Sequence, residues 1–333
     1  MITTILIFLG CAAVIVVAGT FLSKFADAIA DLTGFGRLLI GSVLLAGATS
    51  LPELTVDISA VRLGAIDLAV GDLLGSSLMN LLILALLDLT VHSRGKMLSR
   101  QAAAHALSGT LAAALTALVG LGLLTGKVLA PYSLLGIGPV TYLLAVAYLL
   151  GVRLIYLDQR MAARVAAESH AAVPTPEMSL TKAISGFVLC AVAILVSGPF
   201  LAHAADELAK RSGLGGTFVG TTLVAFSTSL PELVATLAAL RLGAHDLAIG
   251  NIFGSNAFNM ILLAPLDAIY PGSLLAALAP GHAITCIAVV LATQVTIMGQ
   301  LYHAEGRRPL IEPDAWLVIL IVVGSLGLVY YVK

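Results

Sequence analysis

The chain is poor in charged residues, since Asp, Glu, Lys and Arg make up only 11% of its 333 positions. Soluble domains carry roughly 25% charged residues, so this composition excludes an ordinary water-soluble protein. Hydrophobic residues reach 59% and the mean hydropathy is +1.06, which predicts an all-α membrane protein with many spans. A net charge of −1 and the lack of a basic patch predict no nucleic-acid partner.

Cysteine is also scarce, with three copies, Cys11, Cys190 and Cys286. All three fall within predicted helices without metal-ligand spacing, which favours buried, inert thiols. The histidines fall mostly at predicted loops and helix ends, where we expect them to be solvated. No Ser-His or Asp-Asp pair stands in a context that suggests an intramembrane hydrolase. We therefore expect neither an enzyme nor a bound cofactor.

Apolar windows of about 20 residues predict ten transmembrane helices. They cover residues 3–23, 37–61, 67–89, 101–124, 132–155, 181–205, 216–240, 246–269, 281–302 and 314–332. The longest connection, 156–180, is too short for a domain and is expected to link an N-terminal five-helix half at 1–155 to a C-terminal half at 181–333.

The basic residues predict the orientation of these spans. Connections after odd-numbered helices hold twelve of the 17 Lys and Arg residues, and the opposite side holds five. This bias predicts that the linker is cytoplasmic and that both termini lie outside. The expectation is a multi-pass protein of the plasma (inner) membrane, surrounded by lipid, with no obligate protein partner.

The two halves are copies of one another. A shift of 179 residues overlays the chain on itself without a gap, and 18 of the 32 positions from Thr49 to Asn80 are identical to their counterparts. With five spans in each half, the second copy starts on the opposite side of the membrane. The prediction is a pair of inverted five-helix repeats, an arrangement typical of secondary transporters with a site near mid-bilayer.

Each half carries the run Thr-Ser-Leu-Pro-Glu inside a predicted span, at residues 49–53 and 228–232. An ionisable side chain at membrane depth is costly and indicates a substrate or ion path, whereas interhelical glue needs no carboxylate. Proline removes a backbone donor, so we expect freed carbonyls near Ala46, Ala48, Ala225 and Ser227 to be available to a cation.

The motif residues of each half share one helical face, and the next helix adds a serine and an asparagine four residues apart. Together they give ten candidate side-chain ligands: Thr49, Ser50, Glu53, Ser76 and Asn80, and Thr228, Ser229, Glu232, Ser255 and Asn259. All are hard oxygen ligands, which suit Ca²⁺, Mg²⁺ or Na⁺ rather than zinc or copper. Asp57 and Asp72, whose counterparts are Thr236 and Asn251, are candidate accessory residues.

This doubled pattern, Thr-Ser-Leu-Pro-Glu followed by Gly-Ser-x-x-x-Asn, resembles the Ca²⁺/cation antiporter superfamily, specifically its Na⁺/Ca²⁺ exchanger branch. The resemblance covers residues 37–90 and 216–269 and implies two inverted five-helix repeats that exchange Ca²⁺ against Na⁺ by alternating access. The family's coordinating positions fall on the ten side chains above and on the carbonyls of Ala46 and Ala225, within motifs 46–80 and 225–259. Its first and sixth helices slide past the rest, which fits the matched Gly19 and Gly198. Ser77 and Asp72 stand where the family commonly has asparagine.

Two other functions stay open. A carboxyl group removed from water can hold a proton, so the same two glutamates would also suit a Ca²⁺/H⁺ antiporter. The hydroxyl pair before each glutamate favours Na⁺, because the proton-coupled branch resembles Gly-Asn-x-x-Glu at this point. A cation channel is the third option, and countertransport would distinguish it.

Overall fold

The computed structural model describes residues 2–90, 102–168, 178–211, 226–301 and 313–332. Within these ranges the chain is helical, and its only β-type pairing is an isolated bridge between Leu134 and Ile137. Seven of the described helices are long and apolar enough to cross a membrane, or eight if the bent pair Arg37–Thr49 and Leu51–Arg62 counts as one span. The described chain is thus all-helical and multi-pass, as its composition predicts.

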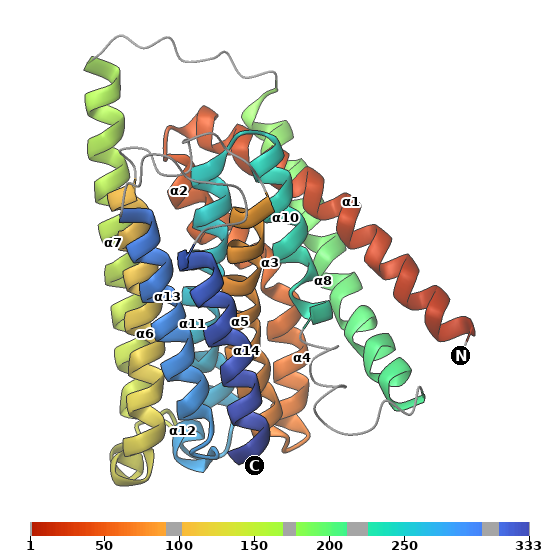
Figure 1. The fold of residues 1–333 in the computed structure, drawn as a ribbon, viewed down its shortest axis with the longest axis vertical. Helices are drawn as coiled ribbons and strands as arrows, with labels where there is room; N and C mark the ends of the chain where they lie inside the picture. The colour runs from red at the N-terminus through yellow and green to blue at the C-terminus, as the bar shows by residue number, and fades with distance from the viewer. Residues whose placement is uncertain (1, 91–101, 169–177, 212–225, 302–312, 333) are drawn as a thin grey trace.

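The first half contains one long helix, a broken segment and three further long helices (Figure 1). In chain order these are α1 (Ile2–Thr33), α2 (Arg37–Leu39), the π-helix η1 (Ile40–Leu45), α3 (Ala46–Thr49), α4 (Leu51–Arg62), α5 (Ile66–Thr90), α6 (Ala102–Leu129), the 3₁₀ turn η2 (Ala130–Tyr132) and α7 (Pro139–Glu168).

The second half repeats this order as far as it is described. It contains α8 (Leu180–Arg211), α10 (Leu230–Arg241), α11 (His245–Ile269), the short α12 (Leu274–Ala277), α13 (His282–Leu301) and α14 (Pro313–Val332). The first part of the predicted helix 216–240 lies outside the described residues.

Several helices differ from their predicted bounds, and α1 and α7 extend furthest beyond them. α1 continues about ten residues beyond the predicted end at 23, because an apolar window stops at the first charges whereas the helix does not. Its charged end is held by Arg37, which pairs with Asp27 and, at 3.0 Å, with Asp31. α7 begins at Pro139, a residue suited to a first helical position, and continues to Glu168, so part of the predicted linker is helical.

α5 and α11 form the centre of the bundle. Their apolar windows are 72% and 83% buried, against 22% for α1, α7 and α8. α1 and α8 lie side by side along one flank (Figure 1). The central helices therefore carry most of the core, and the flanking pair presents most of its surface outward.

The two halves have the same local backbone where their sequences agree. α4 and α10 both end in a Schellman cap, in which Gly64 and Gly243 adopt φ angles of 78° and 75°. The residue after each glycine donates its N–H to the carbonyl five residues back, at 2.9 Å and 3.0 Å respectively. The sequence duplication is therefore also a duplication of structure at these turns.

Glycines let α11 approach α2 and η1 backbone to backbone. A Cβ on Gly250 would lie 2.7 Å from the carbonyl oxygen of Leu38, and one on Gly254 would overlap the backbone of Ser42. Gly41, on η1, faces α11 in the same way, since its Cβ would lie 3.1 Å from the amide nitrogen of Asn251. This contact fixes the segment that leads directly into the first motif.

We predict that Gly254→Ala destabilises the protein, because the added methyl group overlaps main chain rather than the end of a flexible side chain. The free energy of unfolding should fall by about 1–3 kcal/mol, measured as a lower midpoint of thermal unfolding in detergent. Gly10→Ala on α1 is the control, since no described atom lies within 4 Å of its added Cβ. Equal midpoints for the two variants would contradict the packing argument.

Candidate ion-binding site

Both copies of the motif lie at a break between helices. Ser50 separates α3 from α4 with φ −89° and ψ 7°, and Ser229 precedes α10 with φ −81° and ψ 3°. The helices on either side of Ser50 are bent by 45°. Pro52 and Pro231 occupy the second position of α4 and α10. Because Pro52 has no N–H, the Ala48 carbonyl lacks the partner that a continuous helix would supply.

The break puts each glutamate in the first turn of a helix. Glu53 lies in the first turn of α4 and Glu232 in that of α10. The positive end of the helix dipole favours a negative group there. The two carboxylates therefore meet a favourable backbone field where water is absent.

All of the candidate side-chain ligands are buried. Thr49, Ser50, Glu53, Ser76, Asn80, Glu232, Ser255 and Asn259 are 0% exposed, and Thr228 and Ser229 are 1% exposed. Ala46 is likewise buried, whereas Ala225 lies outside the described residues. Such burial removes the water that would otherwise solvate the two carboxylates.

Serine hydroxyls connect the glutamates across the two halves. The Ser50 hydroxyl donates to Glu232 Oε1 at 3.0 Å, and the Ser76 hydroxyl lies 3.4 Å from Glu53 Oε1. Ser76 Oγ is also 3.0 Å from Ser229 Oγ. Each glutamate therefore has a serine partner, and the contacts cross between the halves: Glu232 of the second half meets Ser50 of the first, and Ser76 lies between Glu53 and Ser229.

The two motif threonines make equivalent contacts. Thr49 Oγ1 lies 3.5 Å from Asn251 Oδ1, and Thr228 Oγ1 lies 3.5 Å from Asp72 Oδ1. Thr49 Oγ1 is also 3.5 Å from Ser255 Oγ. Each threonine thus faces the central helix of the other half.

Asn256 is part of this site, although the sequence reasoning did not include it. Its Oδ1 accepts a hydrogen bond from Asn80 Nδ2 at 3.0 Å, and its Nδ2 donates to the Ser77 carbonyl at 3.2 Å. Asn259 Nδ2 contacts the same neighbour, Ser77 Oγ, at 3.4 Å. A signal in the sequence could have indicated Asn256: it and its counterpart Ser77 are both polar, but different, residues at the centre of the repeated motif.

Four acceptor oxygens at the site have no hydrogen-bond partner among the described residues. They are Oε2 of Glu53 and Glu232 and Oδ1 of Asn80 and Asn259. They come from two pairs of equivalent positions, and the amide nitrogens of both asparagines already donate elsewhere. A buried acceptor without a donor is costly, and a cation would satisfy all four.

One expectation about free carbonyls is wrong, while the ligand role of the Ala46 carbonyl stays a prediction. The Ala46 carbonyl is not free, because it accepts hydrogen bonds from the Ser50 amide at 3.0 Å and from Thr49 Oγ1 at 3.2 Å. The bend falls at Ser50, so the last turn of α3 keeps its backbone bonds. A cation at this carbonyl would compete with two existing donors.

The expectation of solvated histidines is also wrong for His105. This residue is 2% exposed, and its Nε2 lies 2.8 Å from Asp246 Oδ1. The contact joins α6 to the start of α11, so the buried histidine has a structural partner.

Among the described residues, no group of three or more His, Cys, Asp or Glu side chains is arranged to hold a metal ion. A cation site around Glu53 and Glu232 would therefore depend on neutral oxygens as well as on the two carboxylates.

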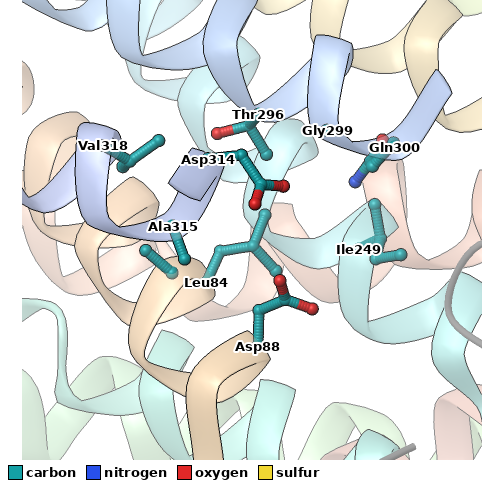
Figure 2. A pocket seen from close by; sticks show the side chains of 10 residues that line it. Leu84, Asp88, Ile249, Thr296, Gly299, Gln300, Asp314, Ala315 and Val318 are labelled. Carbon is teal, nitrogen blue, oxygen red and sulfur yellow. The ribbon is translucent and has the colours of Figure 1, made fainter. Parts of the chain in front are cut away.

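A separate cavity lies between α5, α11, α13 and α14 (Figure 2). It is lined by Leu84, Ala85, Asp88, Ile249, Thr296, Gly299, Gln300, Asp314, Ala315 and Val318. None of these residues is a predicted ion ligand. The cavity is thus distinct from the motif network.

Comparisons with known proteins give a family and a fold. The sequence profile of the family described as sodium/calcium exchanger protein matches residues 3–157 and 182–332. CaxA of Alkalimonas amylolytica is 30% identical over 295 residues, which cover 88% of either chain. The inner membrane protein YrbG of Escherichia coli K12 is 32% identical over 249 residues, 72% of either chain. The solved structure of the sodium-calcium exchanger NCX_Mj has a TM-score of 0.68 at 18% identity and covers 100% of this chain and 99% of its own.

The Asn256 contacts predict a loss of stability in Asn256→Ala, because the substitution leaves the Asn80 amide and the Ser77 carbonyl without their partner. The free energy of unfolding should fall by about 1–2 kcal/mol, measured as a lower thermal midpoint in detergent. Ser59→Ala is the control, since the exposed Ser59 hydroxyl bonds only to the carbonyl of Thr55 in its own helix. An unchanged midpoint in Asn256→Ala would argue against the bridging role.

Proposed function

The chain belongs to the sodium/calcium exchanger protein family, and on that premise we propose that it exchanges Ca²⁺ for Na⁺ across a membrane by alternating access. Its family is one of transporters, so the chain is a multi-pass membrane antiporter and not an enzyme. The identity of both ions at this site and the ligand set are the proposal.

One observation carries the proposal: the four unpaired acceptors of Glu53, Glu232, Asn80 and Asn259. They are hard oxygens buried among hydroxyls, and no described Lys or Arg pairs with either glutamate. Hard oxygen ligands suit Ca²⁺ and Na⁺. We assign the side chains of Thr49, Ser50, Ser76, Thr228, Ser229 and Ser255 to the same site as neutral ligands.

The charge of the site suits an exchange of these ions. Two carboxylates neutralise one divalent cation or two monovalent cations. Ca²⁺ and Na⁺ would therefore compete for the same oxygens, and the site would be occupied by one or the other in turn. An empty site would leave two buried charges unpaired, which is costly and discourages the protein from changing state without a cargo.

For the architecture, we propose ten spans arranged as two inverted five-helix repeats. Support comes from the family match to two separate segments, 3–157 and 182–332, and from the repeated caps of α4 and α10. Pro313–Val329 of α14 is a shorter apolar helix that would supply a ninth span in this proposal, and α10 with the residues before it would supply the tenth. The cytoplasmic linker, the outside termini and the plasma membrane location belong to the same proposal.

The flanking helices suit the moving part of such a transporter. Gly19 of α1 faces Val234 of α10, where a Cβ would lie 3.0 Å from Val234 Cγ1. Its counterpart Gly198 of α8 faces Pro52 of α4. Each flanking helix thus crosses the motif helix of the other half at a glycine, and a sliding movement there would reach both glutamates.

We predict that purified protein in liposomes loaded with Na⁺ takes up Ca²⁺ when it is diluted into Na⁺-free medium at equal pH. Uptake should disappear when an ionophore dissipates the Na⁺ gradient, because the gradient supplies the free energy. Radioactive Ca²⁺ measures the flux. Uptake driven by a pH gradient and indifferent to Na⁺ would assign Ca²⁺/H⁺ exchange instead, and flux without acceleration by the opposing ion would indicate a channel.

Glu53→Gln and Glu232→Gln should each reduce Na⁺-driven Ca²⁺ uptake to the level of protein-free liposomes. Glutamine keeps the shape of the side chain but removes one of the two charges that a divalent cation needs. Elution of a single folded species from size exclusion would separate this loss from misfolding. Asp158→Asn on the exposed face of α7 is the charge-matched control. Wild-type uptake by Glu232→Gln would refute the two-carboxylate site.

A further inference from the structure

Asp57 and Asp72 are buried positions near the site where the two halves differ in charge. Their counterparts 179 residues later are Thr236 and Asn251. Asp57 is 0% exposed and Asp72 is 5% exposed. The first half therefore buries two additional carboxyl groups where the second half has a hydroxyl and an amide.

The neutral pair of the second half satisfies itself. Asn251 Nδ2 donates to Thr236 Oγ1 at 3.0 Å, and Asn251 Oδ1 lies 3.5 Å from Thr49 Oγ1. One arm of the amide is thus directed to α10 and the other to the motif threonine of the opposite half.

The first half repeats this arrangement with different chemistry. Asp72 Oδ1 accepts from Thr228 Oγ1 at 3.5 Å, which is the equivalent of the contact between Asn251 and Thr49. The same correspondence predicts that Asp72 Oδ2 is directed toward Asp57, as Asn251 Nδ2 is toward Thr236.

Three of the four carboxyl oxygens of these two residues have no donor in the described part of the chain. Both oxygens of Asp57 and Oδ2 of Asp72 lack a hydrogen-bond partner among the described residues. An amide and a hydroxyl can pair with each other, but two carboxylates cannot, and their repulsion grows as water is removed. A positive charge between the oxygens, either a bound cation or a shared proton, would therefore stabilise the pair.

We propose that Asp57 and Asp72 form a further cation site, present in the first half alone, that holds a Na⁺ ion moved in each transport cycle. The site rests on the proposed exchange function and adds one Na⁺ to it. The proposed exchange involves Na⁺ and Ca²⁺, and because the two central glutamates are assigned to Ca²⁺, the cation left for this pair is Na⁺. Through Oδ1 and Thr228, Asp72 also connects this ion to the central site, so the two are filled together.

The second half supplies the test variant. The double substitution Asp57→Thr with Asp72→Asn copies the neutral pair that Thr236 and Asn251 already form. This variant keeps the central glutamates and should bind and exchange Ca²⁺. Single Asp57→Asn, which preserves side-chain size, is the second variant in case the double one does not insert.

The readout is the Ca²⁺ gradient at which net flux stops, in liposomes clamped at zero membrane potential with a fixed tenfold Na⁺ gradient. Each Na⁺ coupled to one Ca²⁺ then multiplies the attainable Ca²⁺ ratio by about ten. We expect the double variant to reach a Ca²⁺ ratio about tenfold smaller than that of the parent. An equal ratio would overturn the proposal.

Asp67→Asn is the matched control, because Asp67 lies at the exposed start of the same helix, α5, where its carboxylate contacts His282 at 3.0 Å. It should reach the parent's Ca²⁺ ratio. If the parent shows no Na⁺-driven Ca²⁺ uptake, the exchange proposal fails by itself. Binding of radioactive Na⁺ to the purified protein then tests the further site: one fewer ion per chain in the variant supports it, and an equal number refutes it.

Discussion

Buried oxygens without donors are the constraint on which this molecule depends. Glu53 and Glu232 are withdrawn completely from solvent, yet each keeps one carboxylate oxygen with no partner among the described residues. Asparagine carbonyls at Asn80 and Asn259 repeat the pattern. In a membrane, where water does not solvate such groups, a bound cation lowers their electrostatic energy, as does a proton on a carboxylate. On the proposed function, a loaded site would be stable and an empty one costly, which would link occupancy to the conformation of the protein.

The backbone is arranged to create that set of oxygens. Breaks at Ser50 and Ser229 turn the chain so that each glutamate lies in the first turn of a new helix. Glycines on α11 let it approach α2 and η1 at main-chain distance. The π-helical turns of η1 directly precede the first motif, which agrees with the general occurrence of such turns at functional sites. Irregular backbone and close packing therefore occur together, because a helix that has lost regular bonds needs an adjacent helix to hold it.

The sequence predicts the centre of this structure better than its edges. The repeat at 179 residues predicts that the two Thr-Ser-Leu-Pro-Glu runs lie together, because a carboxylate at membrane depth has few other stable places. Apolar windows misplace the end of α1, since they cannot include the pairing of Arg37 with Asp31 that extends the helix. Asn256 escapes notice because its role comes from a contact with Asn80 on another helix, which spacing along the chain does not contain. Whether the Ala46 carbonyl keeps its hydrogen bonds depends on which residue of the break is bent, and packing decides that residue. Ala225 lies outside the described residues, so its role stays a prediction.

The exposed faces of α1 and α8 have a consequence for the energetics of transport. Large apolar side chains such as Val17 and Phe21 on α1, and Val196 and Phe200 on α8, are about half exposed, and in a bilayer they meet acyl chains. Acyl chains offer the same surroundings at neighbouring depths, so a shift of either helix along the bilayer normal exchanges like for like and transfers little hydrocarbon into water. The lipid would then oppose such a shift very little. Steric resistance would arise mainly on the inner face, where Gly19 and Gly198 have no side chain to obstruct movement past the opposite half.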